Sequence, residues 1–160
     1  MKLILDRRTL LMAGSAALIT RPALAAGSHE VQMLNKDPDD SKRRMVFLPN
    51  VIVVQPGDTI NFLPVDRGHN CETVDGMMPE SAEAWKGKIN EEVSVTLEAP
   101  GFYGYQCTPH VSQGMVGLII VDGEGKMDNF EAAKEVRQRG QAKKVWTAIW
   151  ETVDAEGLAS

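Results

Sequence analysis

A thiol, an imidazole and a thioether lie within nine residues of this chain, at Cys107, His110 and Met115. The spacing Cys-x2-His-x4-Met brings together one soft anionic ligand, one nitrogen ligand and one weak sulfur ligand. This donor set suits a single copper ion that alternates between Cu(I) and Cu(II). A second histidine would complete a trigonal site with a long axial sulfur, and His69 is the remaining internal histidine. The sequence therefore predicts a mononuclear copper site of His69, Cys107, His110 and Met115.

The residues between these ligands also affect the expected chemistry. Pro109 stiffens the segment between Cys107 and His110, and it lacks a backbone N–H that could bond to the cysteine sulfur. Fewer donors to the sulfur lower the reduction potential. His29, near the start of the domain, is interpreted as a surface residue rather than as a ligand.

Short strands must hold these ligands in place. An aromatic strand, Gly101-Phe-Tyr-Gly-Tyr-Gln-Cys107, leads into the cysteine, and an apolar strand leaves from Met115. Other alternating or apolar segments are bounded by turns such as Gln55-Pro-Gly-Asp58, where proline and glycine favour a reversal of the chain. We expect His69 at the end of a neighbouring strand. Seven to eight strands of this kind predict a mainly β protein with a Greek-key β-sandwich.

The C-terminal part has a helical rather than a strand-like pattern. Asp128 and Glu131 form a capping signature for a helix that would end at Gly140. A second helix, from 142 to about 153, carries one apolar stripe that we expect to pack over the sandwich. Between the strands, residues 79–85 are compatible with one short helical turn.

The first 25 residues are typical of an export signal rather than of the fold. Arg7 and Arg8 precede an apolar run, and Ala23-Leu-Ala25 has the form of a cleavage site. The arginine pair favours a twin-arginine signal over a general secretory signal. We therefore expect a signal peptide at 1–25 and one domain at 26–160, with the sandwich at about 29–123 and the helices at about 127–153.

Composition excludes several classes of protein. The whole chain has 17 basic and 22 acidic residues, which argues against nucleic-acid binding. The apolar run of the leader is too short for a membrane span and no later segment approaches the required length, so no membrane anchor is expected. Four protein ligands would leave no open position for a substrate on the copper, which argues against an enzyme.

Several stretches resemble pseudoazurins, a family of blue copper proteins with the cupredoxin fold. The resemblance runs from about Val31 to the C-terminal helices and rests on the following segments: Gln32-Met-Leu-Asn-Lys36, Pro56-Gly-Asp-Thr59, Pro64-Val-Asp-Arg-Gly-His-Asn70, Glu83-Ala-Trp-Lys-Gly-Lys-Ile-Asn-Glu91, Ala99-Pro-Gly101, and Tyr105-Gln-Cys-Thr-Pro-His110 with Gly114-Met115. It implies a cupredoxin sandwich with two C-terminal helices, a type 1 copper held by the four residues named above, and electron transfer in the periplasm.

The resemblance also implies supporting and docking roles. Gly68 and Asn70 flank His69 in the family's Gly-His-Asn motif, and Asn70 would tie the two ligand segments together and donate its backbone N–H to the cysteine sulfur. A methionine beside the exposed histidine and surrounding basic residues would form the docking face, which here means Lys36, Met45, Arg67 and Lys86. The segment Val111-Ser-Gln-Gly114 is more polar than in the family, so a weaker apolar patch is expected.

The predicted function is that of a monomeric periplasmic one-electron carrier. It would accept electrons from a c-type cytochrome or a dehydrogenase and deliver them through His110 to a reductase, with copper nitrite reductase as the first candidate. Its complexes with these partners would be transient. A copper-trafficking module without electron transfer is the alternative.

Two cysteines in an exported protein raise the question of a disulfide. A bond between Cys71 and Cys107 would consume the copper thiolate and would leave a stapled binding domain without metal. Cys71 stands where the family has an aliphatic residue, and we interpret it as a small buried apolar residue.

Overall fold

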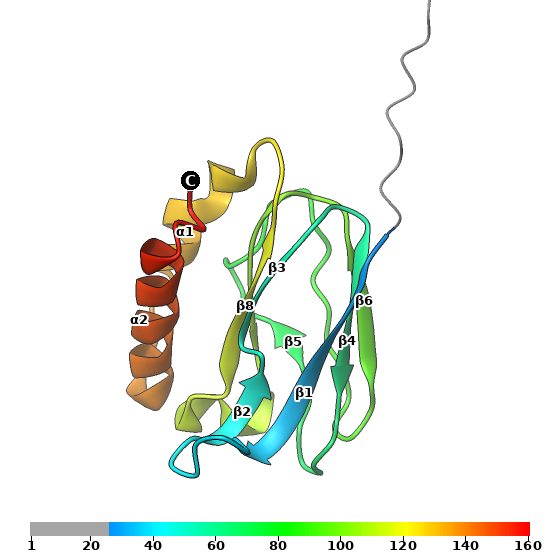
Figure 1. Ribbon diagram of the computed structural model, residues 1–160, viewed down its shortest axis with the longest axis vertical. Helices are drawn as coiled ribbons and strands as arrows, with labels where there is room; N and C mark the ends of the chain where they lie inside the picture. Colours follow the sequence, from blue (N-terminus) through cyan, green and yellow to red (C-terminus); the bar gives the residue numbers. More distant parts are fainter. Residues whose placement is uncertain (1–25) are drawn as a thin grey trace, which may run out of the picture.

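The computed structural model describes residues 26–160, so the signal peptide predicted at 1–25 lies outside the described part. Two four-stranded sheets face each other, and helices lie along one side of the sandwich (Figure 1). One sheet has the order β2-β1-β4-β6 and the other β3-β8-β7-β5. The strands are β1 (Ser28–Lys36), β2 (Arg44–Leu48), β3 (Val51–Val54), β4 (Asp58–Leu63), β5 (Glu72–Thr73), β6 (Val93–Leu97), β7 (Gly101–Gln106) and β8 (Val116–Val121). The mainly β sandwich predicted from the sequence is confirmed.

Alternating strands fill the space between the sheets. In β4, Ile60 and Phe62 are fully buried, whereas the residues beside them are partly exposed. The ring of Phe62 meets Tyr105 of the opposite sheet edge-on, with 5.0 Å between the ring centroids. Apolar side chains from both sheets thus meet in one core, and burial of this apolar area is the main stabilising contribution.

Strand β8 is apolar throughout because both of its faces are covered. Ile119 and Val121 point into the core between the sheets. Leu118 and Ile120 belong to a second cluster, in which the outer face of the sheet packs against Trp146 and other residues of the helices. A continuous apolar run is typical of a strand buried on two sides. The helices therefore cover the outer face of the strand that directly follows Met115.

The C-terminal helices differ in their boundaries from the prediction. A 3-10 turn (η2, Lys126–Asn129) leads into a short helix α1 (Phe130–Glu135), and α2 spans Gly140–Ala155. The prediction that Gly140 ends the first helix is wrong, because the chain leaves the helix at Val136 and Gly140 begins α2. Within the predicted helical segment 79–85, one turn forms at 79–82, where Ala82 N–H donates to the Pro79 carbonyl at 3.0 Å.

The predicted capping role of Asp128 is also wrong. Asn129 precedes α1, and α1 has no side-chain cap. The Asn129 amide instead bonds the backbone N–H and carbonyl of Phe102 in β7, at 2.9 and 2.8 Å. This contact joins the helical region to the sheet. Among residues 26–160, no helix combines the length and apolar character needed to cross a membrane.

Candidate metal centre

The segment between β7 and β8 is a tight loop that carries three of the predicted ligands. Cys107 follows β7 directly, and His110 lies on a 3-10 helix, η1 (Thr108–Gln113), whose first turn contains proline. The loop is closed by its own backbone, because Cys107 N–H donates to the Met115 carbonyl at 3.0 Å and Met115 N–H donates to the His110 carbonyl at 3.2 Å. Gly114 ends η1 in the left-handed region, with φ 95°, which glycine adopts at little cost. These bonds hold Cys107, His110 and Met115 in a defined arrangement.

His69 reaches the site from the connection between β4 and β5. Gly68 precedes it with φ 97°, and Gly68 N–H donates to Asn90 Oδ1 at 2.6 Å. Asn90 N–H in turn donates to the His69 carbonyl at 2.8 Å. Asn90 thus holds the backbone on both sides of the imidazole, and the positive φ explains why glycine stands at position 68.

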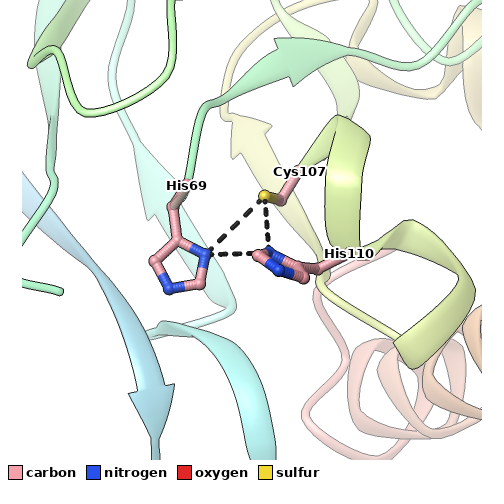
Figure 2. A group of neighbouring side chains, drawn as sticks. All are labelled: His69, Cys107 and His110. Atoms are coloured by element: carbon pink, nitrogen blue, oxygen red, sulfur yellow. Dashed lines mark hydrogen bonds between the residues drawn. The ribbon is translucent and has the colours of Figure 1, made fainter. Parts of the chain in front are cut away.

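The two segments bring three ligand atoms together. His69 Nδ1 lies 3.1 Å from His110 Nδ1 and 3.8 Å from Cys107 Sγ, and Cys107 Sγ lies 3.4 Å from His110 Nδ1. Figure 2 shows the three side chains converging, with His69 on one side and both loop residues on the other. A point equidistant from the three atoms lies about 2 Å from each, close to the usual length of a metal–nitrogen bond. The donor atoms therefore fit a small metal ion.

Burial differs among the four predicted ligands. His69, Cys107 and Met115 are fully buried, and Met115 packs in the same core cluster as Cys107. His110 is partly exposed. Among the four predicted ligands, His110 is therefore the one that reaches the surface.

The surroundings favour the metal-binding form of His69. Burial lowers the pKa of His69, and the neighbouring His110 lowers it further. The neutral imidazole is the form that binds a metal. His69 Nε2 lies 3.0 Å from Asn35 Oδ1, and an N–H on Nε2 that donates to this oxygen leaves Nδ1 free to face Cys107 and His110.

The Cys107 thiol experiences opposing effects. Burial raises the pKa of Cys107, while backbone N–H groups at Asn70 and His110 lower it. The same N–H groups are donors that would stabilise the thiolate once a metal has displaced the proton. A role of the Asn70 N–H at the sulfur stays a prediction from the resemblance.

The Asn70 side chain links the two ligand segments. Its Oδ1 accepts from Thr108 N–H at 2.8 Å, and its Nδ2 donates to Thr108 Oγ1 at 3.0 Å. The same Nδ2 donates to the Gly87 carbonyl at 3.2 Å. Asn70 is 4% exposed, so these bonds lie in a largely dry environment. The amide fixes the position of the His69 segment relative to the Cys107 loop.

The structure answers the question of the second cysteine. Both Cys71 and Cys107 are free and buried, so the alternative of a disulfide between them is wrong. Cys71 belongs to the core between the sheets, and Trp85 Nε1 donates to its sulfur at 3.4 Å. Burial raises the pKa of the Cys71 thiol well above its usual range. Cys71 therefore packs as a small apolar residue.

The predicted docking residues lie on the surface or next to it. Lys36 ends β1, and Lys36, Arg67 and Lys86 are exposed. Lys86 Nζ lies 3.3 Å from a Glu72 carboxylate oxygen. Met45 is partly buried and packs against the core cluster that contains Cys107 and Met115.

Sequence reasoning missed two residues that position His69. Asn35 and Asn90 lie 34 and 21 positions from His69 in the chain, so their contacts depend on the fold. Both asparagines belong to segments that carry the family resemblance, Gln32–Lys36 and Glu83–Glu91. Their place in these segments was the one sequence feature that pointed to them, but it does not show which side chain contacts His69.

Comparisons with known proteins agree with this geometry. A family model described as copper binding proteins of the plastocyanin/azurin family matches residues 32–122. A pseudoazurin from Paracoccus pantotrophus is 43% identical over 135 residues, which cover 84% of this chain and 90% of that protein. The structure of a Sinorhizobium pseudoazurin superposes with a TM-score of 0.74 and 46% identity over 79% of this chain and 96% of that one. The pseudoazurin of Methylobacterium extorquens AM1 gives a TM-score of 0.72 and 39% identity, covering 79% of this chain and 98% of that one. This chain belongs to the pseudoazurins, within the plastocyanin/azurin family of copper-binding proteins.

Proposed function

We propose that this protein carries single electrons in the periplasm, after export directed by residues 1–25, with one copper ion held by His69, Cys107, His110 and Met115. Family membership makes it a blue copper electron carrier rather than an enzyme. Bound copper supplies the one-electron chemistry by alternating between Cu(I) and Cu(II). The proposal adds the identity of the ligands, the compartment and the partner. That partner is a periplasmic reductase, with copper nitrite reductase as the first candidate.

The convergence of His69 Nδ1, Cys107 Sγ and His110 Nδ1 within 4.8 Å of one another carries the assignment of the ligands. The ligand loop is closed by backbone bonds to Met115, and Asn70 ties it to the His69 segment. Such a frame resists rearrangement when the charge at the site changes. Small movement on electron transfer is what a carrier requires, and it supports this role over a reaction that needs an open site.

The surroundings of His110 support a docking role. A shallow depression beside Pro109 includes Ile89, whose surface is 54% exposed, and it is bordered by Lys86. This depression, which also touches Thr108, adds apolar surface close to His110 in the chain. The basic residues Lys36, Arg67 and Lys86 would steer an acidic partner toward His110. Small, short-lived complexes are expected from such a surface.

The visible spectrum of the oxidised, copper-loaded protein tests the ligands. We expect an intense thiolate-to-copper band that Cys107→Ser abolishes. Cys71→Ser is the matched control, because Cys71 is also buried but bonded to Trp85, and it should keep the band. A band that persists in Cys107→Ser would refute the assignment.

Stopped-flow mixing of the reduced protein with a copper nitrite reductase tests the partner. The rate constant should fall as salt is added, and Arg67→Gln or Lys86→Gln should lower it at low salt. Arg137→Gln removes the same charge outside the docking residues and serves as the control. A rate that does not depend on salt, with a normal spectrum, would reject the docking surface and leave the copper site intact.

The copper-trafficking alternative receives less support from the site. Three of the four predicted ligands, His69, Cys107 and Met115, are fully buried, whereas exchange of the metal requires access. Slow removal of copper by a competing chelator would agree with the carrier. Release within seconds would favour trafficking.

A further inference from the structure

A pocket of about 240 Å³ lies beside the ligand loop and is separate from the docking depression near Pro109. Its walls come from the start of β2, the end of η1 and the first turns of α2. Figure 1 shows that the β1–β2 connection, the ligand loop and the beginning of α2 lie at the same end of the molecule. The volume is below the roughly 300–1,000 Å³ that is usual for drug-sized ligands, so an occupant must be small.

Three consecutive cations, Lys42, Arg43 and Arg44, form one wall of this pocket. No acidic side chain is found among the described residues that line it, although the chain carries a formal net charge of −5. Within residues 26–160, Arg43 is the one of the three with an ion-pair partner, Asp37, at 2.7 Å. Lys42 and Arg44 therefore keep their charge available for an anion.

The connection that carries these cations is ordered by Asp37. This carboxylate is 3% exposed; it accepts from the Arg43 guanidinium and from Asp39 N–H, the latter at 2.9 Å. The backbone of Asp37 also donates to the Arg43 carbonyl at 3.0 Å. The basic wall is thus held in place by a buried carboxylate, and it faces the pocket without needing to fold around a ligand.

The other walls are apolar or carry amides. Val46 and Val145 provide an apolar surface, and Gln113 and Gln141 provide side-chain amides that can donate to an anion. Apolar contact with a few convergent polar groups is the usual composition of a small-molecule site. A bare inorganic anion would leave the apolar walls unused, and a neutral ligand would leave the cations unused.

We propose that this pocket binds a small organic monocarboxylate, with its carboxylate at Lys42 and Arg44 and its apolar body against Val46 and Val145. The pocket also touches Gly114, which directly precedes Met115. A bound carboxylate adds negative charge beside the ligand loop and favours the more positive metal ion, so it lowers the reduction potential. The effect on the reduction potential rests on the proposed copper site, whereas binding of the carboxylate does not.

Titration of the Cu(I)-loaded, 15N-labelled protein with benzoate tests the site, because Cu(I) leaves the amide signals unbroadened. We expect saturable shifts at residues 113–116 and at Val145. Benzamide has the same shape without the charge, and sulfate has charge without the apolar body, so both should bind at least tenfold more weakly. Equal binding of benzamide, or no saturation at millimolar benzoate, would overturn the proposal.

Variants locate the binding. Arg44→Gln should weaken benzoate binding by about tenfold, the usual effect of losing one charge-assisted bond. Lys42→Gln provides a second, independent test, and Arg43 is left unchanged because it anchors the connection through Asp37. Arg137→Gln, with the same loss of charge elsewhere, should bind as the parent does. Unchanged affinity in both Arg44→Gln and Lys42→Gln would refute the site, and a potential unaffected by bound benzoate would refute the coupling to the metal.

Discussion

The Asn70 side chain provides the sharpest test of how the metal centre is built. Asn70→Ala removes three hydrogen bonds, two to Thr108 and one to the Gly87 carbonyl, at 2.8 to 3.2 Å. Each bond contributes about 0.5–1.5 kcal/mol net, and the buried position places the expected loss at about 2–4 kcal/mol. For a domain of this size that loss corresponds to a fall of roughly 6–14 °C in Tm.

Urea unfolding of the copper-free protein measures this loss without a contribution from the metal. Asn61→Ala is the matched control, because Asn61 also bonds two neighbours, Ser28 at 3.0 Å and Ser94 at 2.7 Å, but on an exposed face. Its loss should be under about 1 kcal/mol, since water replaces exposed bonds. Equal losses in the two variants would show that Asn70 does not tie the two ligand segments together. Copper loading should also slow in Asn70→Ala, because the ligands are then held less firmly.

Two further predictions concern the frame around the site. Asp58 accepts from His29 and from Gln55 N–H, both at 2.9 Å, and these bonds help to lower its pKa from 3.8 to about 2. Because the folded state favours the ionised carboxylate, this stabilisation is complete above about pH 4 and fades as the pH falls toward 2. Urea unfolding should therefore show a larger loss of unfolding free energy for Asp58→Asn at pH 7 than at pH 2.5. Equal losses at the two pH values would contradict the assignment. Gly117 lies under the Tyr105 ring, and an added Cβ would overlap it. Gly117→Ala should lower the free energy of unfolding by about 1–3 kcal/mol, and an unchanged urea midpoint would show that the ring moves aside at no cost.

The sandwich was predictable because strand signals are local. Alternation in β4 and the apolar run of β8 appear in the sequence as patterns of neighbouring residues. The helix boundaries were less predictable. The capping signature at Asp128 was locally sound, but Asn129 makes the contact that matters, with the backbone of Phe102, 27 positions away. A tertiary contact thus overrode a local preference.

The metal centre also combines residues that local sequence predicts with residues that only tertiary contacts reveal. Cys107, His110 and Met115 could be proposed as ligands from their types and spacing, because a single loop carries all three. His69 was proposed by elimination and by resemblance, since its approach to Cys107 spans 38 positions. Asn35 and Asn90, which orient His69, could not be named, because nothing in their own segments indicates contact with an imidazole.

The sequence by itself determined the chemistry of this protein: a soft donor set in one loop, a β-sandwich to hold it and an acidic chain with local basic segments. Only the tertiary structure decided which histidine nitrogens face the thiol, that Cys71 stays free beside Trp85, and that three cations of the β1–β2 connection line a pocket next to Gly114. The physical reason is the separation along the chain of the residues that decide each feature. Ligand type and strand periodicity are properties of neighbouring residues, whereas orientation, burial and pockets arise where distant segments pack together.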